Sequence, residues 1–300
     1  MAVYVNTNVS SLNGRRYLNN VQNSLTTTYQ RLSSGMRINS AKDDAAGLQI
    51  ADRLTTQING LNQGNRNTND GIALAQTVEG ALDETSSMLQ KIRTLAVQAA
   101  NGTNTDADRK AINAEANSLM SEITRIAQQT KFGGASVLDG AVANSIYGTQ
   151  NGGSKGGKTT LQVGANKGDE ISFSVNNMKF SIIASRALGN NGTNDGFANN
   201  KLQLSKADGA KAAIELMDKM IADVDSQRSG LGAIQNRLES SIRNQSNVAA
   251  NQSDARSRIR DADFAEESAN LSQQSIIQQA ATSMLMQANS RPQLALSMLG

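Results

Sequence analysis

The chain of 300 residues contains no cysteine, no histidine and no tryptophan. It therefore has no disulfides, thiolate nucleophiles or imidazole bases, and it lacks the commonest ligands of zinc and iron. The carboxylates, lysines and hydroxyl groups that remain show no distinctive pairing. The sequence thus indicates no catalytic residue, no cofactor-binding residue, no bound cofactor and no metal site, and we expect a structural protein rather than an enzyme.

Aromatic residues and proline are also scarce. Aromatic side chains make up 3% of the chain, and Pro292 is the single proline. Large side chains therefore cannot fill a compact interior, and the apolar content comes from alanine, leucine, isoleucine, valine and methionine, which pack well along helix seams. This composition favours long helices over a conventional globule.

The sequence also lacks the signals of secretion, membrane insertion and nucleic-acid binding. The first eight residues show neither a basic start followed by an apolar stretch nor a small-residue cleavage site, which predicts no cleaved secretory signal. No run of about 18 apolar residues is present, so we expect no membrane insertion. The net charge is +3 and the basic residues are scattered, so we expect no nucleic-acid partner.

Both ends of the chain carry apolar residues at helical spacing. In the N-terminal segment they follow a heptad pattern, with Thr28 in one position of the seam. The C-terminal segment, from Asp263, has an apolar face that is too wide for one partner helix, which predicts contacts with other copies of the chain. The predicted self-assembly interface consists of Leu18, Val21, Leu25, Leu32, Leu271, Ile276, Ile277, Met284 and Leu285.

Longer helices are predicted between these ends. One runs from about Ile50 to Ala100 after a non-helical connector at 37–47, and a second starts at Asp106 or Asp108 and ends near Phe132. A third helix begins near Lys206. Its apolar seam is interrupted by Arg228, Gln235 and Gln245, so we expect polar pairs to set part of its register.

The composition changes to glycine, asparagine, serine and threonine between about residues 135 and 200. Short period-two runs at 160–163, 171–175 and 178–182 predict strands, and Asn176–Asn177 suits a hairpin turn between the last two. We expect this region to be an exposed β-ribbon with loops. The fold class is accordingly mainly α, an elongated antiparallel helical bundle or coiled coil formed by the N- and C-terminal segments, with a small β-hairpin region in the middle.

One motif favours another function. Residues Gly152–Thr159 match the phosphate-loop pattern of a Walker A segment, which would indicate a nucleotide-binding protein. A working phosphate loop leaves a buried strand and enters a helix whose N-terminus holds the phosphates. The residues that follow, 160–164, predict a strand instead, so nucleotide binding is the minor alternative.

Several longer motifs resemble bacterial flagellin. In the N-terminal half these are Arg31–Gly47, Asn69–Ala73, Glu79–Leu82 and Leu95–Gln98. In the C-terminal part they are Ser257–Glu267 and Gln278–Asn289. The resemblance covers roughly residues 1–140 and 205–300.

The resemblance implies a structural subunit that polymerises into the extracellular filament of the bacterial flagellum, used for motility. Residues 1–45 plus 256–300 would form inner filament-core helices, 46–140 plus 201–255 an outer rod of helices, and 141–200 a β-hairpin and loop insert. Such subunits are exported unfolded through the flagellar type III apparatus, without a cleaved signal peptide. A secreted flagellar cap or adhesin component is the second alternative.

The resemblance also implies partners. Besides other copies of the chain, these are an export chaperone, the hook–filament junction proteins and the cap protein. Toll-like receptor 5 is a further implied partner, and Lys91 stands where many receptor-activating members have arginine, whose bidentate contacts lysine cannot copy. The implied receptor contacts are Gln90, Lys91, Arg93, Leu95 and Glu115.

Overall fold

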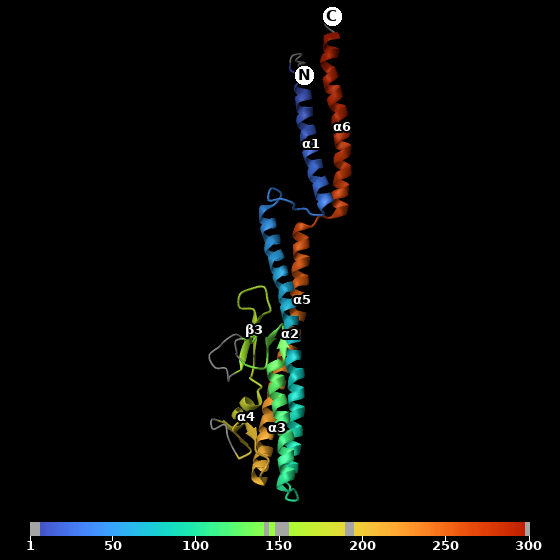
Figure 1. Ribbon diagram of the computed structural model, residues 1–300. Helices are drawn as coiled ribbons and strands as arrows, with labels where there is room; N and C mark the ends of the chain where they lie inside the picture. The colour runs from blue at the N-terminus through green and yellow to red at the C-terminus, as the bar shows by residue number, and fades with distance from the viewer. Residues whose placement is uncertain (1–6, 141–143, 148–155, 190–194, 298–300) are drawn as a thin grey trace. The chain divides into compact units, whose positions relative to one another are not determined.

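The computed structural model describes residues 7–140, 144–147, 156–189 and 195–297, and the side chains up to residue 290. These residues form six helices and three small antiparallel strand pairs (Figure 1). The elements are, in order, α1 (Val9–Ser34), α2 (Ala45–Ala100), α3 (Asp106–Gln129), β1 (Lys131–Phe132), β2 (Ala135–Ser136), β3 (Gly157–Gln162), β4 (Glu170–Val175), α4 (Phe180–Leu188), β5 (Phe197–Ala198), β6 (Lys201–Leu202), α5 (Ala207–Arg260) and α6 (Phe264–Ser297). The predicted mainly α fold, with small strand pairs in the middle of the chain, is confirmed.

The chain divides into two compact units. The terminal unit comprises residues 1–58 and 249–300, and the central unit comprises residues 59–248. Helices α2 and α5 contribute to both units.

In the terminal unit, α1 and α6 run antiparallel. Arg31 Nη1 lies 3.1 Å from Glu267 Oε1 at one end of the pair, where α1 ends and α6 begins. At the other end the Asn8 side-chain amide donates to the carbonyl oxygen of Ala288 over 2.7 Å. Thr28, the polar member of the predicted seam, is buried and donates to Gln274 Oε1 over 3.2 Å. The N-terminal heptad pattern therefore packs against the C-terminal helix of the same chain.

The connector between α1 and α2 is held by backbone hydrogen bonds to the segment between α5 and α6. Gly35 ends α1 in the left-handed conformation, with φ of 70°. Its carbonyl accepts from the amide of Ala262 over 3.0 Å, and the amide of Arg37 donates to the carbonyl of Arg260 over 2.7 Å. These hydrogen bonds hold the α1–α2 connector against the α5–α6 connector.

Helix α2 begins at Ala45, five residues before the predicted start, and ends as predicted at Ala100. The reason is an N-terminal cap that hydrophobic periodicity does not reveal. Asp44 Oδ1 accepts from the amides of Ala46 and Gly47 over 3.0 and 2.9 Å, so the carboxylate satisfies amides of the first turn. Gly47, predicted to lie in the connector, is therefore helical.

Polar pairs link α2 and α5 in the central unit, as the interruptions of the apolar seam predicted. Arg228 Nη2 lies 3.0 Å from Asp83 Oδ1, and Gln235 Nε2 donates to Glu79 Oε2 over 2.8 Å. Gln245 behaves differently, because its Nε2 donates to Ser241 on the same helix. The partners show that α2 and α5 run antiparallel in a single register.

The middle of the chain is where the sequence prediction is wrong. The hairpin pairs β3 with β4, with Thr160 opposite Ser172. Residues 180–182 of the strand expected at 178–182 instead form the first turn of helix α4. Phe180, Ile183 and Ala184 are buried at helical spacing, which outweighed the period-two reading of the same segment. The turn at 176–177 consequently leads into a helix, and Asn177 Oδ1 accepts from the amide of Lys179.

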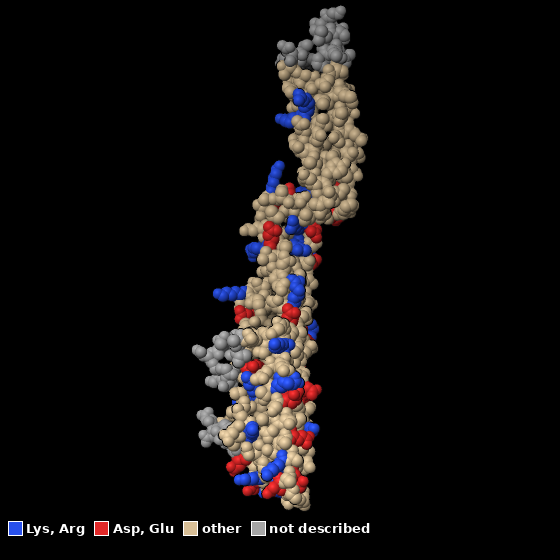
Figure 2. Space-filling model, viewed as in Figure 1, with Lys and Arg blue, Asp and Glu red and all other residues tan. Residues whose placement is uncertain are grey.

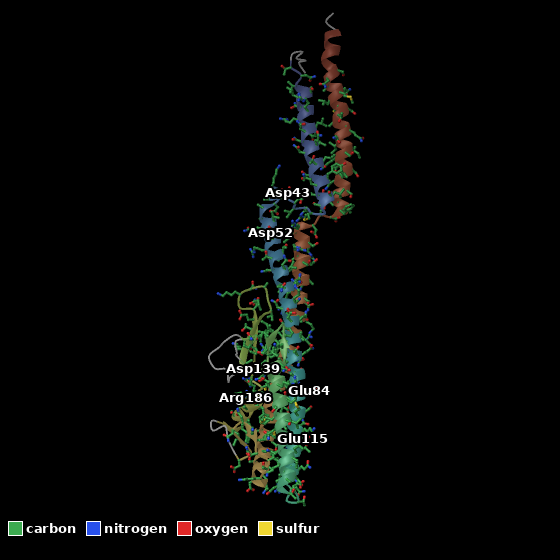
Figure 3. All side chains as sticks on the ribbon, viewed as in Figure 1. Asp43, Asp52, Glu84, Glu115, Asp139 and Arg186 are labelled. Carbon is green, nitrogen blue, oxygen red and sulfur yellow. The ribbon has the colours of Figure 1, made fainter. Side chains whose placement is uncertain are left out.

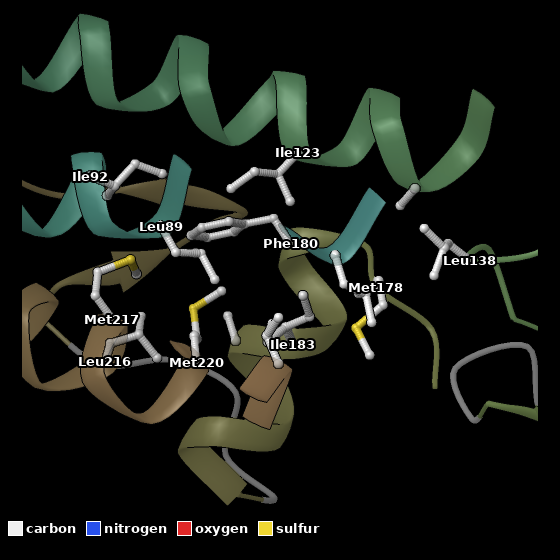
Figure 4. Packing of buried hydrophobic residues seen from close by; sticks show 14 of the residues in the cluster. Leu89, Ile92, Ile123, Leu138, Met178, Phe180, Ile183, Leu216, Met217 and Met220 are labelled. Atoms are coloured by element: carbon white, nitrogen blue, oxygen red, sulfur yellow. The ribbon is translucent and has the colours of Figure 1, made fainter. Parts of the chain in front are cut away.

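This region is also not an exposed ribbon, because it supplies part of the central core. Phe180 lies among the apolar side chains of three helices, including Leu89 of α2, Ile123 of α3 and Met220 of α5 (Figure 4). Met178 and Ile183 join the same cluster, and all of these side chains are buried. The described part of this region therefore packs on the helices of the central unit.

Three glycines of α2 allow the hairpin to lie directly on that helix. A methyl group on Gly64 would lie 2.0 Å from the carbonyl oxygen of Val163, just after β3. The corresponding distances are 2.7 Å from Gly60 to the Ala165 side chain and 2.2 Å from Gly71 to a methyl group of Leu161. Only residues without a side chain permit this close an approach of two segments.

Candidate assembly surface

The predicted interface residues fall into two groups in the terminal unit. Seven of them are half-buried and belong to the side of the α1–α6 pair that is covered within one chain: Leu18, Val21, Leu25, Leu32, Leu271, Ile277 and Leu285. Ile276 and Met284 remain 67% and 72% exposed. The single chain thus satisfies part of the apolar face of α6 and leaves the rest uncovered.

The sequence reasoning missed further exposed apolar side chains of the same unit. They lie outside the predicted seam positions and have about half or more of their surface accessible: Val9, Leu12, Tyr17, Tyr29, Ile50, Phe264 and Met286. The sequence does contain a signal for them, because the face of a helix away from its apolar seam ordinarily carries charged or polar residues and here carries apolar ones. Exposed apolar surface of this extent is typical of an interaction site.

Charge is nearly absent from this surface. No charged residue occurs between Ser268 and Ser290, and no acidic residue occurs among the first 42. Figure 2 shows the same contrast, with few charged side chains over α1 and α6 and many over the central unit. Burial of this surface against another protein therefore requires little desolvation of ions.

A shallow groove runs along one side of the α1–α6 pair. Its small lining residues allow the helices to approach closely, and a side chain at Gly14 would contact Leu285 Cδ1 at 3.1 Å. Tyr17 and Met284 line the groove and are largely exposed. The groove is lined by Ser10, Asn13, Gly14, Tyr17, Ile277, Ala280, Ala281, Met284, Gln287 and Ala288.

The phosphate-loop motif does not have the geometry that nucleotide binding needs. Residues 152–155 lie outside the described residues, while Lys158 and Thr159 belong to β3 and pair with Ser174 and Phe173 of β4. The motif thus leads into an antiparallel hairpin rather than into a helix N-terminus. Nothing in the described part of the hairpin supports the nucleotide-binding alternative.

The part of the chain that the structure describes contains neither a candidate metal site nor a candidate membrane-spanning helix. No group of three or more acidic side chains there is arranged to hold a metal ion. None of the helices in the same ranges combines the length and the apolar character needed to cross a membrane. The uncovered apolar surface is the feature of these residues that calls for a partner.

The implied receptor residues lie on the central unit, four of them on α2 and Glu115 on α3. Lys91 Nζ is 3.3 Å from Glu115 Oε1, and Arg93 Nε is 2.5 Å from Asp218 Oδ1. Gln90, Lys91, Arg93 and Glu115 are exposed, whereas Leu95 is only 8% exposed; Figure 3 labels Glu115 on α3. The hydrogen bond from Arg93 to Asp218 raises the pKa of the guanidinium above its usual value.

Comparison with known proteins gives the class. Residues 5–143 match the family model of the bacterial flagellin N-terminal helical region, and residues 214–299 match that of the C-terminal helical region. Flagellin B of Vibrio anguillarum is 36% identical and flagellin A of Vibrio cholerae 37% identical, each with the full length of both chains covered. The chain belongs to the bacterial flagellin family, a family of structural subunits of the flagellar filament.

A solved structure shows the same fold. The structure of a putative flagellar hook-associated protein from Vibrio parahaemolyticus has a TM-score of 0.58 and 18% identity, over 73% of this chain and 100% of the other. The alignment with the Vibrio anguillarum flagellin extends over 376 residues, more than the 300 of this chain. That relative therefore contains residues without a counterpart here, consistent with the short central segment of this chain.

Proposed function

We propose that this chain polymerises into the flagellar filament used for motility and that the terminal unit makes the contacts between subunits. The observation that carries the proposal is the charge-free apolar surface of α6, with Ile276 and Met284 exposed in the single chain. Burying one leucine or methionine contributes roughly 1.5–3 kcal/mol, so several such contacts per neighbour outweigh the entropic cost of association. The role is structural and not enzymatic, and the site of action is the extracellular filament.

Residues 1–45 plus 256–300 form the inner layer of the filament in this proposal, and 46–140 plus 201–255 form the outer rod. The insert at 141–200 lies on the outer rod. Division of the chain into units at residues 58 and 249 supports a change of role near these positions. The proposed subunit interface comprises Leu18, Val21, Leu25, Leu32, Leu271, Ile276, Ile277, Met284 and Leu285.

Electron microscopy of the purified protein tests the function directly. Long tubes are expected once the concentration exceeds a critical value, because each added subunit covers apolar surface on its neighbours. Short rings or persistent monomers would favour the cap or adhesin component instead.

Removal of both ends should abolish assembly without unfolding the rest. A chain of residues 50–255 keeps the whole central unit and loses α1, α6 and the connectors, so it is expected to remain a helical monomer. Circular dichroism measures the helicity and sedimentation measures the mass, with the full chain under the same conditions as control. Polymerisation of the trimmed chain would contradict the assignment of the interface to the terminal unit.

Partners other than copies of the chain follow from the same surface. Before assembly the apolar face of α6 is uncovered, which calls for an export chaperone that masks it. The junction proteins at the hook and the cap protein at the tip would contact the same terminal helices at the two ends of the filament. Export of the subunit through the flagellar type III apparatus belongs to the same proposal.

Recognition by Toll-like receptor 5 is proposed for Gln90, Lys91, Arg93, Leu95 and Glu115. The change Lys91→Arg should strengthen activation of the receptor several-fold, because a guanidinium forms bidentate contacts that an ammonium group cannot. A receptor-dependent reporter assay measures the effect. Lys110→Arg is the matched control, because Lys110 is also exposed and is not one of the proposed contact residues. Equal activation by both variants and the unmodified chain would argue against this contact.

A further inference from the structure

The composition makes methionine the main target of two-electron oxidants in this protein. The chain has ten methionines and no cysteine, histidine or tryptophan. Peroxides oxidise a thioether to a sulfoxide, which turns a flexible apolar side chain into a polar one. Which methionines are reached then depends on their exposure.

The described methionines differ widely in exposure, and Met36, Met88 and Met120 are half-buried. Met178, Met217 and Met220 are at most 1% exposed in the core of the central unit. Met284 and Met286 are 72% and 64% exposed. Their thioethers are therefore open to solvent while the core thioethers are not.

Met284 and Met286 lie in the C-terminal third of the charge-free stretch of α6. They are two residues apart, which places them about 200° apart around a helix of 3.6 residues per turn. Met284 lines the groove beside Gly14 and Tyr17, and Met286 is not among the groove residues. Modification of the pair therefore makes two different sides of α6 polar at the same level.

We propose that Met284 and Met286 form an oxidation site through which a peroxide blocks assembly of the free subunit. One peroxide oxygen is transferred to the methionine sulfur, so an S–O bond forms and the O–O bond breaks. The sulfur is oxidised by two electrons and hydrogen peroxide is reduced to water. Burying a sulfoxide without a hydrogen-bond donor is unfavourable, so the modified helix loses affinity for the apolar surface of a neighbour.

The inference rests on the proposed function, because assembly is the process that the sulfoxides block. It also predicts that the free subunit and the filament differ in their sensitivity to peroxide. In the free subunit both sulfurs are exposed, whereas the covered surface of the filament shields them. Oxidation therefore acts on subunits before incorporation and spares those already assembled.

The experiment uses the full-length monomer and limiting hydrogen peroxide. Peptide mass spectrometry follows each methionine, and light scattering with electron microscopy gives the critical concentration. Met284 and Met286 should be oxidised at least about tenfold faster than Met178, Met217 and Met220, as buried thioethers are inaccessible to peroxide. The critical concentration of the oxidised chain should rise at least about tenfold, and a thiol-dependent methionine sulfoxide reductase should restore it.

Two double variants assign the effect to the site. M284L/M286L retains the apolar character of α6 and should assemble before and after peroxide treatment. M88L/M120L changes two half-buried methionines of the central unit. This variant should assemble before peroxide treatment and lose assembly after it, like the unmodified chain. If M284L/M286L itself assembles poorly, peptide mass spectrometry of the unmodified chain decides the same question, because recovery of assembly after reductase treatment should coincide with reduction of the sulfoxides at Met284 and Met286.

The outcomes separate this inference from the proposed function. If the untreated chain forms no filaments, the proposed function fails. If the untreated chain assembles and the oxidised chain assembles at the same critical concentration, the oxidation site fails and the function stands. Equal oxidation of buried and exposed methionines, or loss of assembly by peroxide-treated M284L/M286L, would also overturn the site.

Discussion

Replacement of Leu285 by aspartate is expected to stop filament growth while the central unit stays folded. Leu285 is half-buried beside Gly14 in the α1–α6 pair and belongs to the charge-free stretch of α6. An aspartate there removes the burial of a leucine, worth roughly 1.5–3 kcal/mol, and places an unpaired charge in an apolar seam. The critical concentration should rise at least about a hundredfold, since each 1.4 kcal/mol is a factor of ten.

Light scattering and electron microscopy measure this effect, and circular dichroism checks that the helices of the central unit persist. Leu285→Met is the matched control, because it nearly conserves volume and apolar character and should assemble normally. Normal filaments from Leu285→Asp would show that the packing assigned to α6 is wrong.

The second large effect is expected on stability. Gly64→Ala should destabilise the central unit by about 2–3 kcal/mol, because the added methyl group meets the carbonyl oxygen of Val163 at 2.0 Å and backbone must move. For a unit of 190 residues, this lowers the melting temperature by about 5–10 °C. Thermal unfolding of the monomer, followed by calorimetry or circular dichroism, measures the shift.

Gly80→Ala makes the same chemical change on the same helix and should act in the opposite direction. Apart from the adjacent residues and the nearby backbone of α2 itself, no atom lies within 4 Å of a methyl group built on Gly80. Alanine is favoured over glycine in a helix interior by about 1 kcal/mol, so this variant should melt higher. Destabilisation of equal size in both variants would indicate a general effect of α2 and not a contact with the hairpin.

The helices were predictable because their signals are local. Apolar residues at spacings of three and four predicted α2 and α3 with ends that lie within a few residues of those observed. The polar interruptions at Arg228 and Gln235 also indicated that polar pairs set part of the register of α5. Neither inference needed knowledge of the rest of the chain.

The middle of the chain was harder because its pattern is ambiguous. Phe180 and Ile182 alternate as in a strand, while Phe180, Ile183 and Ala184 share the buried face of a helix. A short apolar segment does not distinguish these periods, and packing against Leu89 and Ile123 decided between them. The same packing turned an expected exposed ribbon into part of the core.

For the assembly surface, too, the sequence determined one part of the answer and the tertiary structure the other. The sequence determined by itself that the chain is mainly helical, contains no cysteine or histidine, and has terminal helices with more apolar surface than one partner covers, since spacing and composition are properties of the chain alone. Only the tertiary structure decided which part of that surface the chain covers itself and which, at Ile276 and Met284, is left for a neighbour. The same holds for the glycines of α2, because a contact such as Gly64 with Val163 joins residues far apart in the chain and leaves no local pattern.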